Sequence, residues 1–333
     1  MKLDGFKEYL QERKLDTDKI GAAVNIINEF RTFLSRHKKS VDTASYDDIY
    51  NFSAYLIENE TNIFENYVNL LRFGYFTKNN EVIVASLEII DGSEMIENFS
   101  KLLIAEFGEK VRNEIFEGIG IPPLGIHPSK KPEIIKKLVD RFLARVGSKK
   151  CKEFFEIGLR DKYTESYKKP TELFQQINNV DEFLRIRHQN LIKTLENHLQ
   201  KGTLFFTQEV DKEVISYVKK NPTIESGLRE GSRVIITKIP YMAKQFIHET
   251  DEKKKRYYYC HNPWIREALI DEEQPITPLF CGCSAGYFKN FWEAVLDQPV
   301  RVEVLESVIG GDKICKFALH LPQEIIDEIE KSI

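Results

Sequence analysis

Apolar side chains recur at steps of three and four along the first hundred residues, which predicts a series of amphipathic helices. One stripe consists of Ile20, Val24, Ile27, Phe30 and Leu34. Asp16 or Thr17 is placed to cap this helix. A second helix is expected after Ser45, because Ser45 and Asp48 have the spacing of a capping box. A third is expected over residues 63–76.

A glycine- and proline-rich segment follows, at residues 118–132. Proline and glycine at this density interrupt a helix, so we place a domain boundary here. The predicted domains are a helical domain, residues 1–117, and a second domain, residues 118–333, whose core is 202–322. Helical patterns resume over 132–146 and 180–199.

From Thr203 onward the pattern changes to short β-branched runs. Strands are predicted over 234–236, 257–260, 300–304 and 316–321, and a helix over 286–296. The turn Gly310-Gly311-Asp312 separates the last two strands. The order of elements predicts an α+β fold, in which a helical N-terminal domain precedes a domain of helices and antiparallel sheet.

Charge and composition limit the classes of protein to which this chain can belong. The net charge is −4 and no apolar run approaches the roughly 20 residues of a membrane span. The N-terminus lacks the apolar core of a secretory signal, and the five cysteines are an odd number. These features predict a cytoplasmic protein with reduced thiols and no membrane partner.

The N-terminal stripes resemble the helical core-binding domain of tyrosine recombinases, over about residues 4–90. In that family the module grips DNA. Residues 1–100 carry 17 acidic and 11 basic side chains, a net charge of 11 − 17 = −6. Because phosphate binding needs a basic surface, we expect a partner or dimerisation module rather than a nucleic-acid-binding one.

Cysteine and histidine gather in the C-terminal third of the chain. Zinc is held by such soft and borderline donors, and the candidate ligands are Cys260, His261, Cys281, Cys283 and Cys315. The spacing Cys281-Gly282-Cys283 is shorter than in most zinc sites, and buried structural cysteine is the alternative.

A nucleophilic cysteine is a third interpretation. Cys283 precedes a predicted helix start, where amide dipoles would stabilise a thiolate and an oxyanion. His261 would be the base, with Glu306 or Asp312 as its acidic partner.

Aromatic and basic side chains near the cysteines suggest a pocket for an organic ligand. Lys238 and Arg266 are the candidates to meet a carboxylate. The candidate pocket aromatics are Tyr259, Trp264, Tyr287 and Trp292. Packing in the core is the alternative interpretation of the aromatic residues.

The stretch Phe280-Cys281-Gly282-Cys283, followed by Glu306-Ser307, Gly311-Asp312 and Cys315-x-Phe317, is similar to a known family. It resembles the small-molecule-binding domain shared by 4-vinyl-reductase-like proteins, phenol-sensing regulators and L-2-amino-thiazoline-4-carboxylate hydrolase-like proteins. The resemblance covers about residues 203–322.

This resemblance implies a compact domain with an apolar pocket, often paired as a dimer. In the sensing branch a zinc ion lies beside the pocket. Cys283 and Cys315 would match two of its cysteine ligands and Glu306 its glutamate, whereas Ser307 replaces another cysteine. In the hydrolase branch, the ring of a small heterocyclic carboxylate would be opened by hydrolysis.

Three hypotheses therefore remain. The protein is a hydrolase of a small heterocyclic carboxylate, a non-catalytic module that binds a ligand or a metal, or a scaffold whose cysteines are core residues. In the first two a small molecule is the partner, and we expect a homo-oligomer.

Overall fold

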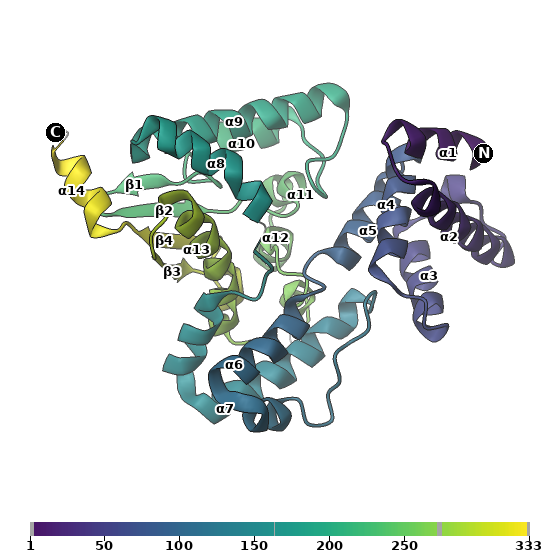
Figure 1. Ribbon diagram of the computed structural model, residues 1–333, viewed down its shortest axis with the longest axis horizontal. Helices are drawn as coiled ribbons and strands as arrows, with labels where there is room; N and C mark the ends of the chain where they lie inside the picture. Colours follow the sequence, from purple (N-terminus) through teal and green to yellow (C-terminus); the bar gives the residue numbers. More distant parts are fainter. Residues whose placement is uncertain (1–2, 163, 272–274, 332–333) are drawn as a thin grey trace. The chain divides into compact units, whose positions relative to one another are not determined.

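The computed structural model describes residues 3–162, 164–271 and 275–331 (Figure 1). The chain divides into two compact units. Unit 1 comprises Met1–Ser93 and Ile121–Lys131, and unit 2 comprises Glu94–Gly120 and Pro132–Ile333. The boundary that the sequence predicts after residue 117 stays a prediction.

Unit 1 is built from the helices that the apolar stripes predict. Its helices are α1 (Leu3–Glu12), α2 (Thr17–Arg36), α3 (Tyr46–Glu58), α4 (Phe64–Thr77) and α5 (Asn80–Ile90). The capping box at the start of α3 is confirmed, since the Ser45 side chain accepts a hydrogen bond from the Asp48 main chain and the Asp48 carboxylate accepts one from the Ser45 main chain. Asp16 occupies the N-cap position of α2 without a side-chain hydrogen bond.

The glycine- and proline-rich segment 121–131 packs onto these helices through its main chain. The Ser53 hydroxyl donates to the Gly125 carbonyl oxygen at 2.8 Å, and Asn62 Nδ2 donates to the Leu124 carbonyl oxygen at 2.9 Å. Gly125 has a φ of +91°, and a Cβ atom at this position would lie 2.1 Å from the Ser53 hydroxyl oxygen. Only glycine fits both the conformation and the space.

Unit 2 begins with two long helices, each broken at one glycine. These are α6 (Met95–Ile115), broken at Gly108, and α7 (Lys131–Ile157), broken at Gly147; Lys131 itself is grouped with unit 1. The remaining helices of the first half are α8 (Thr164–Ile177), α9 (Val180–Lys201) and α10 (Lys212–Lys220).

A four-stranded antiparallel sheet organises the second half of unit 2. The strands are β1 (Leu228–Glu230), β2 (Arg233–Thr237), β3 (Arg301–Glu306) and β4 (Lys316–His320), in the order β1-β2-β4-β3. A bulge interrupts the pairing of β3 between Val304 and Glu306. The α+β fold that the sequence predicts is therefore confirmed.

Four α-helices accompany the sheet in sequence: α11 (Ala243–His248), α12 (Glu252–Tyr259), α13 (Gly282–Leu296) and α14 (Gln323–Lys331). Along β2, alternate residues Val234 and Ile236 face a core that contains Phe288 and Trp292 of α13. Lys238 is the next residue in this alternation, just beyond the end of β2.

The predicted strand at 257–260 is wrong, because residues up to Tyr259 belong to α12. Three tyrosines favour a strand locally, but the Asp251 side chain accepts a hydrogen bond from the main chain of Lys254 and caps a helix here. The helix predicted at 286–296 begins earlier, at Gly282, and follows a short 3-10 helix over Pro278–Cys281.

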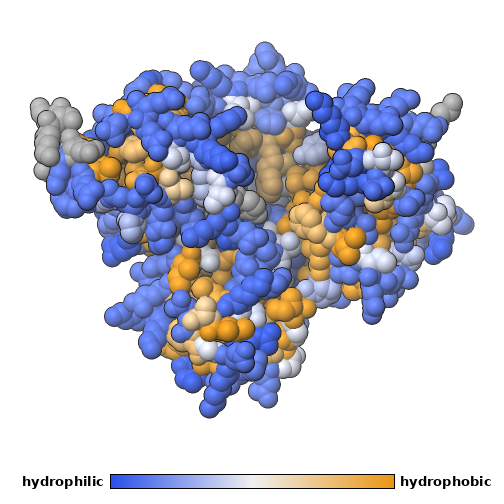
Figure 2. Space-filling model, viewed as in Figure 1, coloured by the Kyte–Doolittle hydropathy of each residue, from blue (hydrophilic) through white to orange (hydrophobic). Residues whose placement is uncertain are grey.

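Polar side chains cover most of the face shown in Figure 2, and apolar residues form separate patches between them. Ile63 and Phe64, at the start of α4, are 59% and 52% exposed. Within the ranges that the structure describes, every helix is too short or too polar to cross a membrane.

Candidate functional site

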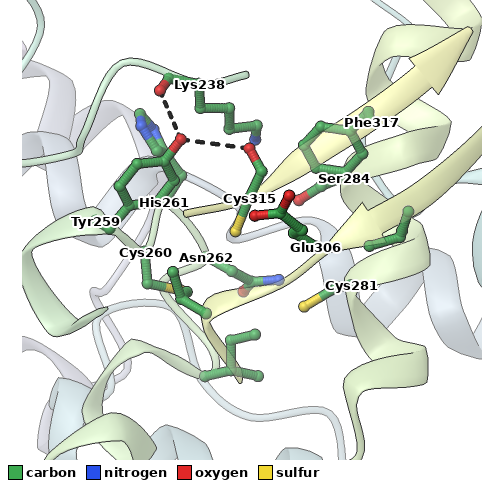
Figure 3. Close-up of a pocket in the computed structure, with 13 residues that line it drawn as sticks. Lys238, Tyr259, Cys260, His261, Asn262, Cys281, Ser284, Glu306, Cys315 and Phe317 are labelled. Atoms are coloured by element: carbon green, nitrogen blue, oxygen red, sulfur yellow. Dashed lines mark hydrogen bonds between the residues drawn. The ribbon is translucent and has the colours of Figure 1, made fainter. Parts of the chain in front are cut away.

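Three cysteines of unit 2, Cys260, Cys281 and Cys315, line a small cavity, which we call the thiol cavity (Figure 3). Its volume is about 20 Å³, which is enough for about one water molecule. The lining residues with polar or sulfur groups are Lys238, Tyr259, Cys260, His261, Asn262, Cys281, Ser284, Glu306 and Cys315. An organic ligand does not fit in this space.

Local structure places Cys260, Cys281 and Cys315 at the cavity and Cys283 beside it, next to the lining residue Asn262. Cys260 follows the last residue of α12, Cys281 ends the 3-10 helix before α13, Cys283 is in the first turn of α13, and Cys315 precedes β4. Cys260, Cys281 and Cys283 are each less than 8% exposed, whereas Cys315 is partly buried. Segments far apart in the sequence therefore converge here.

Burial keeps these thiols protonated. It raises the pKa of Cys283 to about 11 and that of Cys315 to about 12, and the neighbouring Cys260 thiol adds to both shifts. Asn262 Nδ2 donates to Cys283 Sγ at 3.4 Å, and the Ser307 hydroxyl donates to Cys281 Sγ at 3.0 Å. A reactive thiolate requires a lowered pKa, so this arrangement does not activate Cys283.

The other predicted catalytic residues lie nearby with partners of their own. His261 Nε2 donates to the Ile239 carbonyl oxygen at 2.5 Å, which fixes the tautomer protonated on Nε2. Glu306 forms an ion pair with Lys316. Asp312 Oδ2 accepts a hydrogen bond from the Ser307 main chain at 2.8 Å. The catalytic role of Cys283 remains a prediction, and it would require a rearrangement that exposes the thiol.

The second predicted role of the cysteines is to hold a zinc ion. Among the residues that the structure describes, no three His, Cys, Asp or Glu side chains are placed to hold one metal ion. Ser307, in the place of a cysteine ligand, uses its hydroxyl as a donor to Cys281. The predicted zinc ligands are therefore brought together, but their arrangement does not fit zinc.

An open cleft of about 370 Å³ shares Glu306 with the thiol cavity. Its other charged and polar lining residues are Lys152, Glu156, Ser307 and Asp312. Burial raises the pKa of Glu156, although Lys152 acts in the opposite direction. Of the predicted catalytic residues, the cleft thus brings together Glu306 and Asp312.

The predicted pocket residues separate into two groups. Trp264 and Trp292 are 4% and 1% exposed and belong to hydrophobic cores, so they line neither the thiol cavity nor the cleft. Arg266 is also buried, with its guanidinium 4.3 Å from the ring centroid of Tyr241. Tyr259 and Lys238 do line the thiol cavity, and the Tyr259 hydroxyl donates to the Lys238 carbonyl oxygen at 2.8 Å.

The Lys238 ammonium also reaches a second group of charged side chains. We call it the charged recess and define it by Arg187, Glu225, Lys238 and Tyr287. Lys238 Nζ lies 5.7 Å from the ring centroid of Tyr287, and Arg187, Glu225 and Tyr287 interact electrostatically with one another. The four residues come from α9, the loop before β1, the end of β2 and α13.

Arg187 is held between aromatic rings and a main-chain carbonyl. Its guanidinium carbon lies 4.2 Å from the ring centroid of Phe291 and 5.6 Å from that of Phe183. Nη2 donates to the Glu225 carbonyl oxygen at 3.4 Å, and Nε is buried without a hydrogen-bond partner among the described residues. A buried guanidinium N–H without an acceptor is costly, so it indicates a missing partner.

Three members of this group, Arg187, Glu225 and Lys238, are partly buried, and Tyr287 is exposed. Tyr287 keeps 41% of its surface exposed, yet burial raises the pKa of its hydroxyl to about 12. Burial also lowers the pKa of Arg187 to about 10 and raises that of Glu225. Water therefore hydrates these charges poorly, and they interact more strongly than charges on an open surface.

Sequence reasoning identified Lys238 and Tyr287 but missed Arg187 and Glu225. The sequence does contain a signal for Arg187. This residue lies four positions after Phe183 and four before Leu191, on a face of α9 that is otherwise apolar. The sequence contains no comparable signal for Glu225, since acidic residues are common in loops.

Comparisons with known proteins add no relative. The chain matches no family model, and searches of curated proteins and of solved structures found no similar protein.

Proposed function

We propose that unit 2 binds a small organic carboxylate in the charged recess. One observation carries the proposal: Nε of the Arg187 guanidinium is buried without a hydrogen-bond partner among the described residues, in the group that also contains the Lys238 ammonium. Cationic groups in a poorly hydrated site are stable only when an anion or polar group compensates them.

The chemistry of the two cations suits a carboxylate. A guanidinium donates through a planar fork that matches the two oxygens of a carboxylate, and an ammonium adds a flexible point charge. The rings of Tyr287 and Phe291 lie beside these cations and provide apolar surface for the rest of the ligand.

Binding, rather than hydrolysis, is the proposal because of the state of the thiols. Lys238 is the only residue common to the recess and the lining of the thiol cavity, so a ligand in the recess would lie next to the cysteines. The cavity itself has room for about one water molecule, and Cys283 is protonated at neutral pH.

Calorimetric titration tests the proposal. The probes are acetate, propanoate, benzoate and phenylacetate at constant ionic strength, each compared with its uncharged primary amide. Wild type is expected to bind at least one carboxylate and not its amide. Lys238→Met and Arg187→Met are each expected to weaken that binding about tenfold or more, because a charged hydrogen bond contributes about 1.5–3 kcal/mol.

Two exposed residues of α9 supply matched controls. Lys193→Met and Arg185→Met make the same chemical changes outside the recess and should leave the affinity unchanged. Failure of every carboxylate to bind, or an equal loss in the control variants, would refute the proposal.

A further inference from the structure

The open cleft beside the thiol cavity has walls from three parts of unit 2 that are distant in sequence. Lys152 and Glu156 come from α7, Leu279 comes from the 3-10 helix before α13, and residues 304–307 come from the end of β3 and the turn after it. Its volume of about 370 Å³ lies in the range of sites that bind small molecules. The four residues of the charged recess lie outside its lining, so the cleft is a separate site.

Close packing between α7 and α13 fixes one side of the cleft. Gly282, the first residue of α13, lines the cleft, and a Cβ atom there would lie 3.0 Å from Cβ of Phe155 and 3.2 Å from the main-chain N of Glu156. Two segments that approach this closely hold each other in place. The Glu156 side chain therefore starts from a fixed point of the cleft wall, as in a preformed ligand site.

The opposite side of the cleft presents apolar surface at a β-bulge. Val304 and Glu306 pair with consecutive residues of β4, which leaves Leu305 outside the pairing and 41% exposed. Bulges are frequent beside functional sites, where they redirect a side chain. Leu305, Pro278 and Leu279 all line the cleft and provide a surface for the apolar part of a ligand.

The charged lining of the cleft is predominantly acidic. It contains the carboxylates of Glu156, Glu306 and Asp312 and one ammonium, that of Lys152, a net charge of 1 − 3 = −2. Lys316, which pairs with Glu306 from β4, reduces this excess to −1. A concave surface with an excess of one charge concentrates ligands of the opposite charge.

The Glu156 carboxylate is only loosely neutralised by the protein. Lys152 Nζ lies 3.8 Å from Glu156 Oε1, which is beyond hydrogen-bond distance. The Glu156 side chain is 21% exposed, and burial raises its pKa, so water hydrates the ionised form poorly. The Lys152 side chain is 52% exposed and can turn toward the solvent when another cation takes its place.

We propose that the cleft binds a small organic cation, a primary ammonium group on an apolar body, with the ammonium paired to Glu156 and the body against Leu279 and Leu305. Glu306 and Asp312 add electrostatic attraction. An inorganic cation suits the cleft less well, because its carboxylates are not among any described group of three that could hold a metal ion and the apolar wall would have no role.

The test compares amines with the alcohols of the same shape. The probes are hexylamine with hexan-1-ol, benzylamine with benzyl alcohol, and 2-phenylethylamine with 2-phenylethanol, titrated calorimetrically at pH 7 and constant ionic strength into the full chain. Wild type is expected to bind at least one amine about tenfold or more tightly than its alcohol, the range of a charge-assisted hydrogen bond.

Glu156→Gln is the principal variant, because it removes the charge and keeps the size of the side chain. It should reduce the preference for the amine to less than about fivefold, which is what exposed carboxylates can still contribute. Glu106→Gln makes the same change at an exposed position of α6 and should leave the preference unchanged.

Two further variants change binding in different directions. Lys152→Met removes the competing cation and should tighten amine binding by up to about fivefold. It also keeps the proposal testable if Glu156→Gln fails to fold. Leu305→Ser removes apolar surface and should weaken an amine and its alcohol by the same factor.

Several results would overturn the proposal. These are no binding of any amine, equal binding of amine and alcohol to wild type, a preference unchanged in Glu156→Gln, and weaker amine binding in Lys152→Met. Nα-acetyl-L-lysine methylamide presents the same ammonium as a protein side chain and should bind more weakly than hexylamine, because its amide groups would lose water against apolar walls. Tighter binding of that compound would overturn the assignment to a small molecule.

Discussion

α13 contacts the turn that follows α7 at Gly286. The substitution Gly286→Ala adds one methyl group at this contact and tests how closely the two segments pack. A Cβ atom on Gly286 would lie 2.4 Å from Cα and 2.5 Å from N of Gly158. Both atoms belong to the main chain, so neither can rotate away. The helix or the turn must move as a body.

Two opposing effects determine how much Gly286→Ala changes the free energy of unfolding. Overfilling a packed interior costs about 1–3 kcal/mol, and contact with main-chain atoms places Gly286→Ala near the upper value. Alanine is a better helix former than glycine by about 1 kcal/mol. The free energy of unfolding of unit 2 is therefore expected to fall by about 2 kcal/mol.

Thermal unfolding followed by circular dichroism measures this change. A domain of this size loses about 2–4 °C in Tm per kcal/mol, so the expected shift is about −4 to −8 °C. Gly21→Ala is the matched control, because Gly21 lies on the exposed face of α2 and a Cβ there meets no atom within 4 Å. That change should instead stabilise unit 1 by about 1 kcal/mol. A neutral or stabilising effect of Gly286→Ala would show that α13 does not touch the Gly158 turn.

Four further predictions concern the thiols, the metal, unit 1 and Glu225. Native titration with an aromatic disulfide at pH 7 should find Cys283 unreactive over minutes, because burial raises its pKa to about 11; a fast thiol that is lost in Cys283→Ser would restore the nucleophile hypothesis. Elemental analysis should find zinc far below one ion per chain, since the described donors do not group in threes, and stoichiometric zinc would contradict this. Gly125→Ala should destabilise unit 1 by about 2 kcal/mol or more, measured as a loss in Tm, from a positive φ and the clash with the Ser53 hydroxyl; an unchanged Tm would refute the close approach. Burial raises the pKa of Glu225 above its ordinary 4.5, so wild type loses stability as pH rises from about 4.5 through the folded-state value; unliganded Glu225→Gln should therefore melt above wild type at pH 7 and like it near pH 4, and a lower Tm at pH 7 would contradict the shift.

The sequence predicted those parts of the fold whose signals are local. Helices α2, α3 and α4 follow from apolar spacing and from the Ser45 capping box, and β2 follows from its β-branched run. The strand predicted at residues 257–259 was wrong because three consecutive tyrosines favour a strand. The helix there begins after Asp251, whose side chain caps it and which lies outside the tyrosine run.

The candidate site was less accessible to sequence reasoning because it is assembled from distant segments. The clustering of cysteines 260, 281, 283 and 315 in the sequence indicated that they belong together, and three of them line one cavity while Cys283 lies beside it. Their raised pKa values depend on mutual burial, which spacing does not encode. The hydrogen bond from Arg187 to the Glu225 main-chain carbonyl depends on how α9 packs beside β1 and the loop before it, and no local pattern in the sequence predicts that packing.

The edges of the sheet limit how copies of this chain could associate. One edge strand, β1, has three residues and carries Arg229 and Glu230; the other, β3, carries Arg301 and Glu303 and is bent by its bulge. A short or bulged edge with charged side chains is a poor template for another strand. A homo-oligomer, if it forms, would therefore be joined through helices rather than by a sheet continued across subunits. The same two edges should also resist fibrillar growth.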